Sequence, residues 1–415
     1  MKTRKKLLFP ALFLLALLLT LMLTMFELMH SPSSWSIEEN RALASAPQVS
    51  ARSVWDGTLA QDAEAFYKDH IAARRLLIKL DTAIQMQVLR RAAVHDVVVG
   101  NTVLLPAPGF SARLTDEELK QKAEAIAEGI QSVKQAADEA GAQLLYTLVP
   151  EQRTVFAEYY PDWMDNPGQQ TKRSRQALFA ALEREEIPAL DLTPVFAQQS
   201  DLLSCYSRVD HHYTLKGAYV TYQSVCEAFG IRASEISIAE TQSDLLGTYN
   251  RKLYDLSPVR EAMQVVQTPF PEYERLDNGA DSDTPLIRIR GSGQSLYGDY
   301  MGGDIAETIV RTNRPALPRI LIVGDSFTNA LELLAVFDFD EMRSLDYRHF
   351  DGPVLSDYIR AYRPACTEYS NIGTDWLVRG TTFLIHEGRS FNCGARGLKA
   401  ILSHLLPPFS RKTTF

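Results

Sequence analysis

Hydrophobic and polar positions alternate along much of this chain in a way that predicts helices and strands in turn. Residues 119–137 carry apolar side chains at steps of three and four, which is typical of one buried helix face. Thr115 and Glu118 have the spacing of a capping box at its start, and Gly141 suits its end. Residues 143–149 then form a nearly continuous apolar run, as expected for a parallel strand buried on both faces.

The same alternation recurs further along the chain. Helical patterns cover residues 170–186, 215–229 and 327–336, and strand-like runs cover residues 189–192 and 319–323. A succession of strand, helix, strand and helix predicts a doubly wound α/β sheet.

Two other regions follow different patterns. Residues 55–91 have a helical, amphipathic pattern, and a short strand is expected at residues 97–99. Residues 231–316 contain scattered glycine and proline and short pieces rich in Val, Ile and Tyr, without a long period. We therefore expect residues 231–316 to be an irregular, β-rich insertion in the α/β domain.

The amino-terminal segment is predicted to anchor the chain in a membrane. Basic residues dominate residues 1–6, and the run that follows to Phe26 is uncharged, rich in leucine and long enough to span a bilayer. No small-residue cleavage motif follows closely, so we predict an uncleaved signal anchor at residues 7–29. A long, cleaved signal peptide is the alternative. Residues 1–6 would stay in the cytoplasm and the bulk of the chain would be extracytoplasmic, with residues 30–55 as a juxtamembrane linker.

Composition narrows the possible functions. The formal net charge of -8 and the lack of a basic cluster beyond residue 6 argue against a nucleic-acid partner. No nucleotide-binding motif is present, so no cofactor is expected. The four cysteines lack zinc-type spacing, so no structural metal is expected either. In an exported chain they permit two disulfides, and a Cys205–Cys226 bridge would brace the segment between them.

Gly324, Asp325 and Ser326 form a candidate nucleophile turn. They follow the strand at residues 319–323 and precede a helix, and α/β proteins place their sites at the carboxyl ends of strands. A serine hydroxyl would be exposed there, close to backbone N–H groups that can stabilise an oxyanion. The alternative is that Ser326 or Asp325 merely caps the helix.

Asp210, His211 and His212 offer the groups that a serine nucleophile needs. An imidazole takes the serine proton, and a carboxylate fixes the imidazole tautomer. Three other interpretations stay open for this run: a solvated loop, a metal site, or a metal-dependent phosphoesterase with an Asp-His-His run. The phosphoesterase would need further aspartate clusters for two metals, and the amino-terminal half has no convincing set.

Taken together, these segments resemble the DHHW proteins, which are related to the AlgX/AlgJ-type alginate O-acetylation proteins. The run from Asp210 to Tyr213 stands where that family has Asp-His-His-Trp, and the Gly-Asp-Ser turn follows later in the chain, in the family's order. The resemblance covers roughly residues 36–364, and further matching segments lie at residues 36–43, 149–151, 339–341 and 346–348.

The resemblance implies a circularly permuted SGNH-hydrolase-like domain of the flavodoxin-like, three-layer type at residues 56–364. It makes Ser326 the nucleophile, His212 the base and Asp210 the orienting acid, although His211 could take the role of His212. Gly324, Asp325, His211, Tyr213 and Arg348 would support the site, and we expect Arg348 to form a buried ion pair, with Asp346 as the candidate partner. The implied substrate is an extracellular polysaccharide or cell-wall glycan, and the implied partner is a membrane-bound O-acyltransferase that donates the acetyl group.

Two points remain open in the sequence. A non-catalytic glycan-binding or scaffold protein could share this fold, and burial of Ser326 beneath residues 231–316 would favour it. Residues 365–415 do not look like the family, and residues 381–385 are either its missing strand after an insertion or a chance match.

Overall fold

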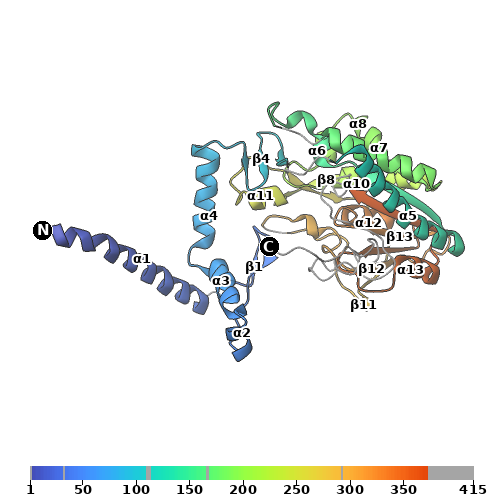
Figure 1. Cartoon of the computed structure of the whole chain (residues 1–415). Helices are drawn as coiled ribbons and strands as arrows, with labels where there is room; N and C mark the ends of the chain where they lie inside the picture. Colours follow the sequence, from blue (N-terminus) through green and yellow to red (C-terminus); the bar gives the residue numbers. More distant parts are fainter. Residues whose placement is uncertain (1, 31–32, 109–113, 165–167, 291–292, 373–415) are drawn as a thin grey trace. The chain divides into compact units, whose positions relative to one another are not determined.

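The computed structural model describes residues 2–30, 33–108, 114–164, 168–290 and 293–372 (Figure 1). The chain divides into two compact units. We call residues 1–101 with 248–258 the amino-terminal unit, and residues 102–247 with 259–415 the α/β unit.

The α/β unit is built on a mixed sheet of eight strands in the order β11-β10-β12-β14-β13-β15-β6-β7. The strands from β14 to β7 run parallel to their neighbours, whereas β12, β10 and β11 are added in antiparallel fashion. The strands are β6 (Gln143–Val149), β7 (Ala189–Asp191), β10 (Glu274–Asp277), β11 (Ala280–Asp281), β12 (Glu307–Arg311), β13 (Arg319–Gly324), β14 (Glu341–Asp346) and β15 (Cys366–Ile372).

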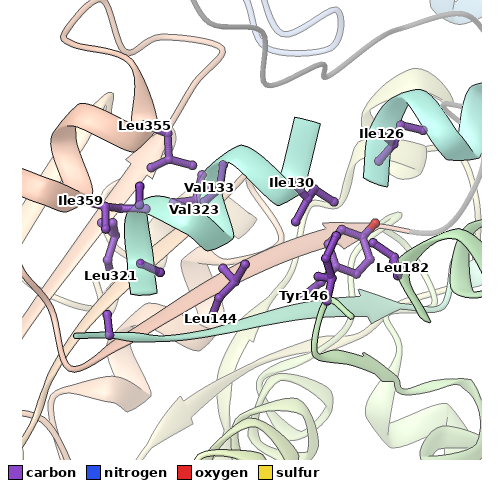
Figure 2. Packing of buried hydrophobic residues seen from close by; sticks show 14 of the residues in the cluster. Ile126, Ile130, Val133, Leu144, Tyr146, Leu182, Leu321, Val323, Leu355 and Ile359 are labelled. Carbon is purple, nitrogen blue, oxygen red and sulfur yellow. The ribbon is translucent and has the colours of Figure 1, made fainter. Parts of the chain in front are cut away.

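Helices lie against both faces of this sheet. On one face α5 packs against α7 and α13, and its buried side chains share a core with Leu321 and Val323 of β13 (Figure 2). On the other face α10 packs against α12 and β6. Burial of each aliphatic side chain in this core stabilises the fold by about 1.5–3 kcal/mol relative to leaving the side chain in water. The helices are α5 (Asp116–Ala140), α7 (Gly168–Arg184), α10 (Leu215–Ala228), α12 (Asn329–Ala335) and α13 (Leu355–Tyr362).

Helix α5 begins and ends at the residues that the sequence predicts. The Thr115 side chain accepts a hydrogen bond from the Glu118 amide while the Glu118 carboxylate accepts one from the Thr115 amide, so the predicted capping box is confirmed. Gly141 ends the helix with a φ of 73°, in the left-handed region. The predicted strands at residues 143–149 and 319–323 are confirmed as β6 and β13, and the predicted helices follow as α5, α7, α10 and α12.

The region at residues 231–316 contributes strands to two sheets. Strands β10, β11 and β12 extend the central sheet, and β8 and β9 form a separate antiparallel pair. The remaining short elements of the α/β unit are β5 (Leu104–Pro106), α6 (Gln152–Val155), η2 (Ala157–Tyr159), α8 (Thr193–Ala197), α9 (Leu202–Cys205), β8 (Ile238–Asp244), β9 (Ala262–Val266) and η3 (Tyr297–Asp299).

The amino-terminal unit begins with the long helix α1. Its stretch Pro10–His30 has a mean hydropathy of 2.4 and is long and apolar enough to cross a membrane, which is consistent with a signal anchor or a signal peptide. Residues 55–91 form more than one helix, since the chain turns at Gly57 and at Ala73, which have positive φ values of 80° and 58°. The other elements are β1 (Trp35–Ser36), β2 (Arg41–Ala42), α2 (Ala51–Trp55), α3 (Thr58–His70), α4 (Arg74–Ala83), η1 (Ile84–Val88), β3 (Ala93–Val94), β4 (Val97–Val99) and α11 (Thr248–Lys252), with α1 at Lys2–His30.

The suggested Cys205–Cys226 disulfide is wrong. Both residues are buried thiols. A Cβ atom on Gly217 would lie 2.1 Å from the Cys205 carbonyl oxygen, so Cys205 contacts the start of α10. Cys226 lies nine residues further along that helix, or about 13 Å at 1.5 Å per residue. A disulfide requires Cα atoms roughly 4.4–6.8 Å apart, so the two thiols cannot meet.

The sequence interpretation also missed a strand of the central sheet. Residues Cys366–Ile372 form β15, which lies between β13 and β6 and is parallel to both. The segment at residues 381–385, considered as the missing strand, lies outside the described residues. Strand β15 was overlooked because its polar residues Thr367 and Glu368 do not form the continuous apolar run that marks β6 and β13.

Candidate active site

Ser326 lies in the turn that follows β13, three residues before α12 begins. Glycine is required at position 324, because a Cβ atom there would lie 2.3 Å from the Thr328 methyl group. The Asp325 carboxylate accepts a hydrogen bond from the Phe327 amide at 3.0 Å, and the Asp325 carbonyl accepts one from the Thr328 amide at 2.9 Å. Asp325 therefore holds the turn, which leaves the Ser326 hydroxyl available for another partner.

The loop with Asp210 and His212 connects α9 to α10 and is fixed from two sides. The Ser207 hydroxyl accepts hydrogen bonds from the amides of Val209 at 3.2 Å and Asp210 at 3.0 Å. The Gln152 side-chain amide donates to the carbonyls of Ser207 at 2.6 Å and Asp210 at 3.0 Å. Since the backbone polar groups of this buried loop are paired, its shape is well determined.

Two close contacts tie this loop to its surroundings. Gly247 lies against it, and a Cβ atom there would be 2.2 Å from the Val209 carbonyl oxygen. The Tyr213 hydroxyl donates to the Phe327 carbonyl at 2.7 Å, which joins the histidine loop directly to the serine turn. Tyr213 is thus a brace between the two predicted segments rather than a group at the reacting atoms.

His212 joins Asp210 to Ser326 through hydrogen bonds on both ring nitrogens. Its Nδ1 lies 2.6 Å from Asp210 Oδ1, and its Nε2 lies 2.8 Å from Ser326 Oγ. The carboxylate accepts only, so Nδ1 carries the proton in the neutral ring, and Nε2 accepts from the Ser326 hydroxyl. Asp210 and His212 are buried whereas Ser326 is partly exposed, so the hydroxyl is the member of this group that solvent reaches.

Tyr297 packs flat against one face of the His212 ring. The sequence analysis did not identify Tyr297 as a site residue. The two rings stack with centroids 3.8 Å apart and planes 4° apart. Burial raises the pKa of the Tyr297 hydroxyl well above its usual value, so it stays neutral. Among the described residues, this hydroxyl has no hydrogen-bond partner.

His211 lies beside the same carboxylate as His212. Its Nδ1 lies 3.2 Å from Asp210 Oδ1, and its side chain is 44% exposed. Its ring lies 3.8 Å from that of His212 at an angle of 38°. The structure therefore places His212, and not His211, between Asp210 and Ser326.

Arg348 forms the expected ion pair with Asp346, although its side chain is 29% exposed and the pair is not buried as predicted. Its guanidinium contacts Asp346 at 2.6 Å and Asp304 at 3.1 Å. Burial lowers the pKa of Arg348, but these carboxylates outweigh it and the net shift is upward, so the side chain stays charged. Burial raises the pKa of the nearby Asp325 carboxyl, and the Phe327 amide and the charge of Arg348 offset part of that rise.

A second buried carboxyl group supports the histidine loop. Glu261 accepts a hydrogen bond from the Arg208 amide at 2.6 Å. Burial raises its pKa to about 7, although its hydrogen bonds to Arg208 and Ser207 act in the opposite direction. Ser207 in turn holds the Asp210 amide, so a chain of hydrogen bonds connects Glu261 to the loop.

Two groups of side chains in the described part of the chain have metal-ligand chemistry. They are Asp210 with His211 and His212, and Asp304 with Asp346 and His349. In the first group the Asp210 and His212 side chains are already hydrogen-bonded to each other. In the second group Asp304 and Asp346 already form ion pairs with Arg348, and the positive charge of Arg348 disfavours a cation there.

Sequence reasoning missed Tyr297, Gln152 and Glu261. Gln152 directly follows the Val149-Pro150-Glu151 end of β6, and its place at a carboxyl strand end was a signal that could have identified it. Tyr297 and Glu261 lie in the region without a long period, where the sequence pattern gives no indication of which side chains turn inward.

The mixed sheet with helices on both faces and the Ser-His-Asp arrangement at its carboxyl edge define the class of protein, an α/β domain of the SGNH-hydrolase-like kind. The family model described as "SGNH hydrolase-like domain, acetyltransferase AlgX" matches residues 110–279. That match includes Asp210 and His212 and ends before Ser326.

Longer matches extend the comparison. A Pseudomonas putida protein described as probable alginate O-acetylase AlgJ is 22% identical over 351 residues, which is 78% of this chain and 88% of the relative. PatB1 of Bacillus cereus aligns in structure with a TM-score of 0.57 at 17% identity, over 70% of this chain and 99% of PatB1. A DHHW family protein from Eubacterium siraeum aligns with a TM-score of 0.56 at 17% identity, over 72% of this chain and 98% of its own. The chain is therefore similar to the AlgX/AlgJ-type SGNH hydrolase-like acetyltransferases, over the stretch that the family model matches and over most of the length of the AlgJ relative.

Proposed function

We propose that this chain is a membrane-anchored, extracytoplasmic serine enzyme that transfers or hydrolyses acetyl groups on an exopolysaccharide or cell-wall glycan. The observation that carries the proposal is the unbroken set of hydrogen bonds from Asp210 through His212 to Ser326, at 2.6 and 2.8 Å. The partial exposure of Ser326 also favours an enzyme over a scaffold.

The reaction follows from this geometry. His212 Nε2 takes the Ser326 proton as Oγ attacks the ester carbonyl carbon, and Asp210 stabilises the imidazolium that forms. The imidazolium then protonates the leaving alcohol oxygen as the ester bond breaks, which leaves an acetyl group on Ser326. A sugar hydroxyl or water attacks this acetyl-enzyme, gives its proton to His212, and releases Ser326 with its proton restored.

The transition-state oxyanion needs donors at the serine turn. The amides of Phe327 and Thr328 already donate to Asp325, so we assign the Ser326 amide as the backbone donor of this turn. Arg348, paired with two carboxylates at the edge of the turn, would contact substrate rather than the reacting atoms.

The finer features of the proposal come from the family. Asp210 and His212 precede Ser326 in the chain, which agrees with a circularly permuted SGNH-hydrolase-like domain. The name of the alginate O-acetylase relative supports a polysaccharide as substrate. We propose that α1 stays as an uncleaved anchor and that a membrane-bound O-acyltransferase supplies the acetyl group.

The test is acetate release from a chromogenic acetyl ester by the full chain in detergent. Ser326→Ala and His212→Ala should lower turnover by up to about a million-fold, as loss of a serine nucleophile or its base does in triad enzymes. His211→Ala is the matched control, and it should keep most of the activity. Equal rates in the wild type and Ser326→Ala would exclude the serine mechanism, and inactivity of both toward every acetyl donor would support a scaffold.

A further inference from the structure

The amino-terminal unit has an exposed apolar stripe on α4 and η1. We define the stripe as Leu76, Leu77, Leu80, Ile84 and Val88, whose side chains are between 41% and 72% exposed. Their spacing of three or four residues keeps them on one side of the helix. Soluble proteins rarely leave such a continuous apolar face in water, so the stripe indicates an interaction surface.

The side of α4 away from the stripe faces the interior of the unit at Thr82 and is open to solvent at the first turn, at Arg75. Thr82 is the buried residue of this helix, and it follows Leu80 by two positions, or 200° around the axis. The Thr82 hydroxyl hydrogen-bonds to the Ile78 carbonyl at 2.7 Å and contacts His95 Nε2 at 2.9 Å. The helix is therefore held by its polar side while its apolar side points away from its own unit.

The start of α4 is fixed to the outer part of α1. The Ala72 amide, two residues before α4, donates to the Thr24 hydroxyl at 2.9 Å, and Thr24 is buried. Thr24 precedes the end of α1 at His30 by six residues, or about 9 Å along the axis. If α1 spans a bilayer, α4 therefore begins close to the outer end of that span.

Basic residues flank the stripe at both ends. Arg74, Arg75 and Lys79 lie near its start, and Arg90 and Arg91 follow its end. Asp81 is the only acidic residue between positions 72 and 92. Among the described residues, Glu39 and Glu38 pair with Arg74 and Arg75, so the positive charge not offset by these pairs is greater toward the far end. An apolar face bordered by lysine and arginine is typical of a helix that lies in the membrane interface.

We propose that the stripe on α4 and η1 lies in the interface of the outer leaflet, with its leucines toward the acyl chains and Lys79, Arg90 and Arg91 at anionic headgroups. A lipid surface is a better occupant than a second copy of the chain, because the contact with Thr24 places the stripe beside the predicted span. The inference rests on the proposed anchor but not on the acyl-transfer reaction.

The test places a polarity-sensitive fluorophore on the full chain reconstituted into vesicles of phosphatidylcholine and phosphatidylglycerol. A Leu80→Cys label reports on the stripe, and an Arg75→Cys label on the opposite, 76% exposed side of the same helix is the matched control. The three described native cysteines are buried, and an unlabelled background is checked with the wild type. We expect the Leu80 label to shift to the blue and to be quenched by lipid-borne quenchers placed about 5–10 Å below the headgroups, and the Arg75 label to do neither.

Other outcomes would overturn the proposal in distinguishable ways. Water-like spectra at both positions would show that the stripe does not meet lipid. A blue shift at Leu80 without lipid quenching would assign the stripe to a second copy if it depends on protein concentration, and to another part of the chain if it does not. Failure of the full chain to float with the vesicles would overturn the proposed anchor as well. The ester assay is independent of all these results, so the two proposals can fail separately.

Discussion

Helices α4 and α5 are both amphipathic, and their apolar faces have opposite surroundings. Helix α5 buries nine residues, and its isoleucines pack against the central sheet (Figure 2). Helix α4 buries only Thr82, and its leucines are exposed. The periodicity of a helix therefore shows that one face needs an apolar partner but does not identify that partner.

The largest predicted difference concerns stability. Ile130→Ala in α5 should lower the free energy of unfolding of the α/β unit by about 2–5 kcal/mol, because it removes buried methyl groups and leaves a cavity. The measurement is hydrogen exchange of the amides of β6 and β13 in the full chain in detergent.

Leu80→Ala in α4 is the matched comparison. It should change the same exchange rates by no more than about 0.5 kcal/mol, since exposed positions away from a core have small effects. A large loss of protection in Leu80→Ala would mean that α4 is part of the core of the α/β unit, which would remove the contrast between the two helices.

The pKa values of two carboxyl groups, one in each unit, are shifted in opposite directions. Burial raises the pKa of Glu261 in the α/β unit to about 7. In the amino-terminal unit the hydrogen bonds from the Arg41 guanidinium hold the pKa of Asp69 well below its usual range. Glu261 keeps its proton up to about pH 7, whereas Asp69 stays ionised well below its usual pKa.

Glu261 should therefore make the α/β unit less stable as the pH rises. Its pKa is higher in the folded chain than the usual 4.5, so between about pH 4.5 and 7 the folded state holds a proton that the unfolded state releases. At about 1.4 kcal/mol per pKa unit, the loss amounts to at most about 3.5 kcal/mol. Glu261→Gln should flatten this dependence when unfolding of the unit is followed by hydrogen exchange from pH 5 to 8.

Asp69→Asn tests a dependence of stability on pH that has the opposite sign. The lowered pKa of Asp69 means that its contribution is present at neutral pH and is lost as the pH falls below the unfolded value of about 3.9. Exchange of the α3 amides should show that loss in the wild type and not in the variant. A rise in α3 stability toward acid pH in the wild type would contradict the assigned ion pair.

A modest effect on activity is predicted for Tyr297. Tyr297→Phe keeps the ring that stacks on His212 and removes a hydroxyl without a partner among the described residues, so stability should change by less than about 1 kcal/mol. Tyr297→Ala removes the stack, worth about 0.5–1.5 kcal/mol, and should slow ester hydrolysis by about tenfold. A shift of the pH–rate profile in Tyr297→Ala but not in Tyr297→Phe would show that the ring positions His212.

The sequence was most informative where one local signal determines the structure. The apolar run of β13 followed by Gly324-Asp325-Ser326, and the Asp-x-His spacing at position 210, predicted elements that the structure brings within hydrogen-bond distance. Neither Tyr297 nor Glu261 has such a signal, because each reaches the histidine loop through tertiary packing. Strand β15 has polar residues at positions where its neighbours are apolar, and the Cys205–Cys226 suggestion ignored the length of α10 between the two thiols.

The most direct test of the central claim is covalent labelling of Ser326 with an aryl sulfonyl fluoride, read by intact mass and peptide mapping. His212 should take the serine proton as the oxygen–sulfur bond forms and fluoride leaves, so the full chain should gain one adduct on Ser326. His212→Ala should react far more slowly, and Ser326→Ala should gain no adduct at this turn. Absence of an adduct in the wild type, or equal labelling in His212→Ala, would contradict an activated serine.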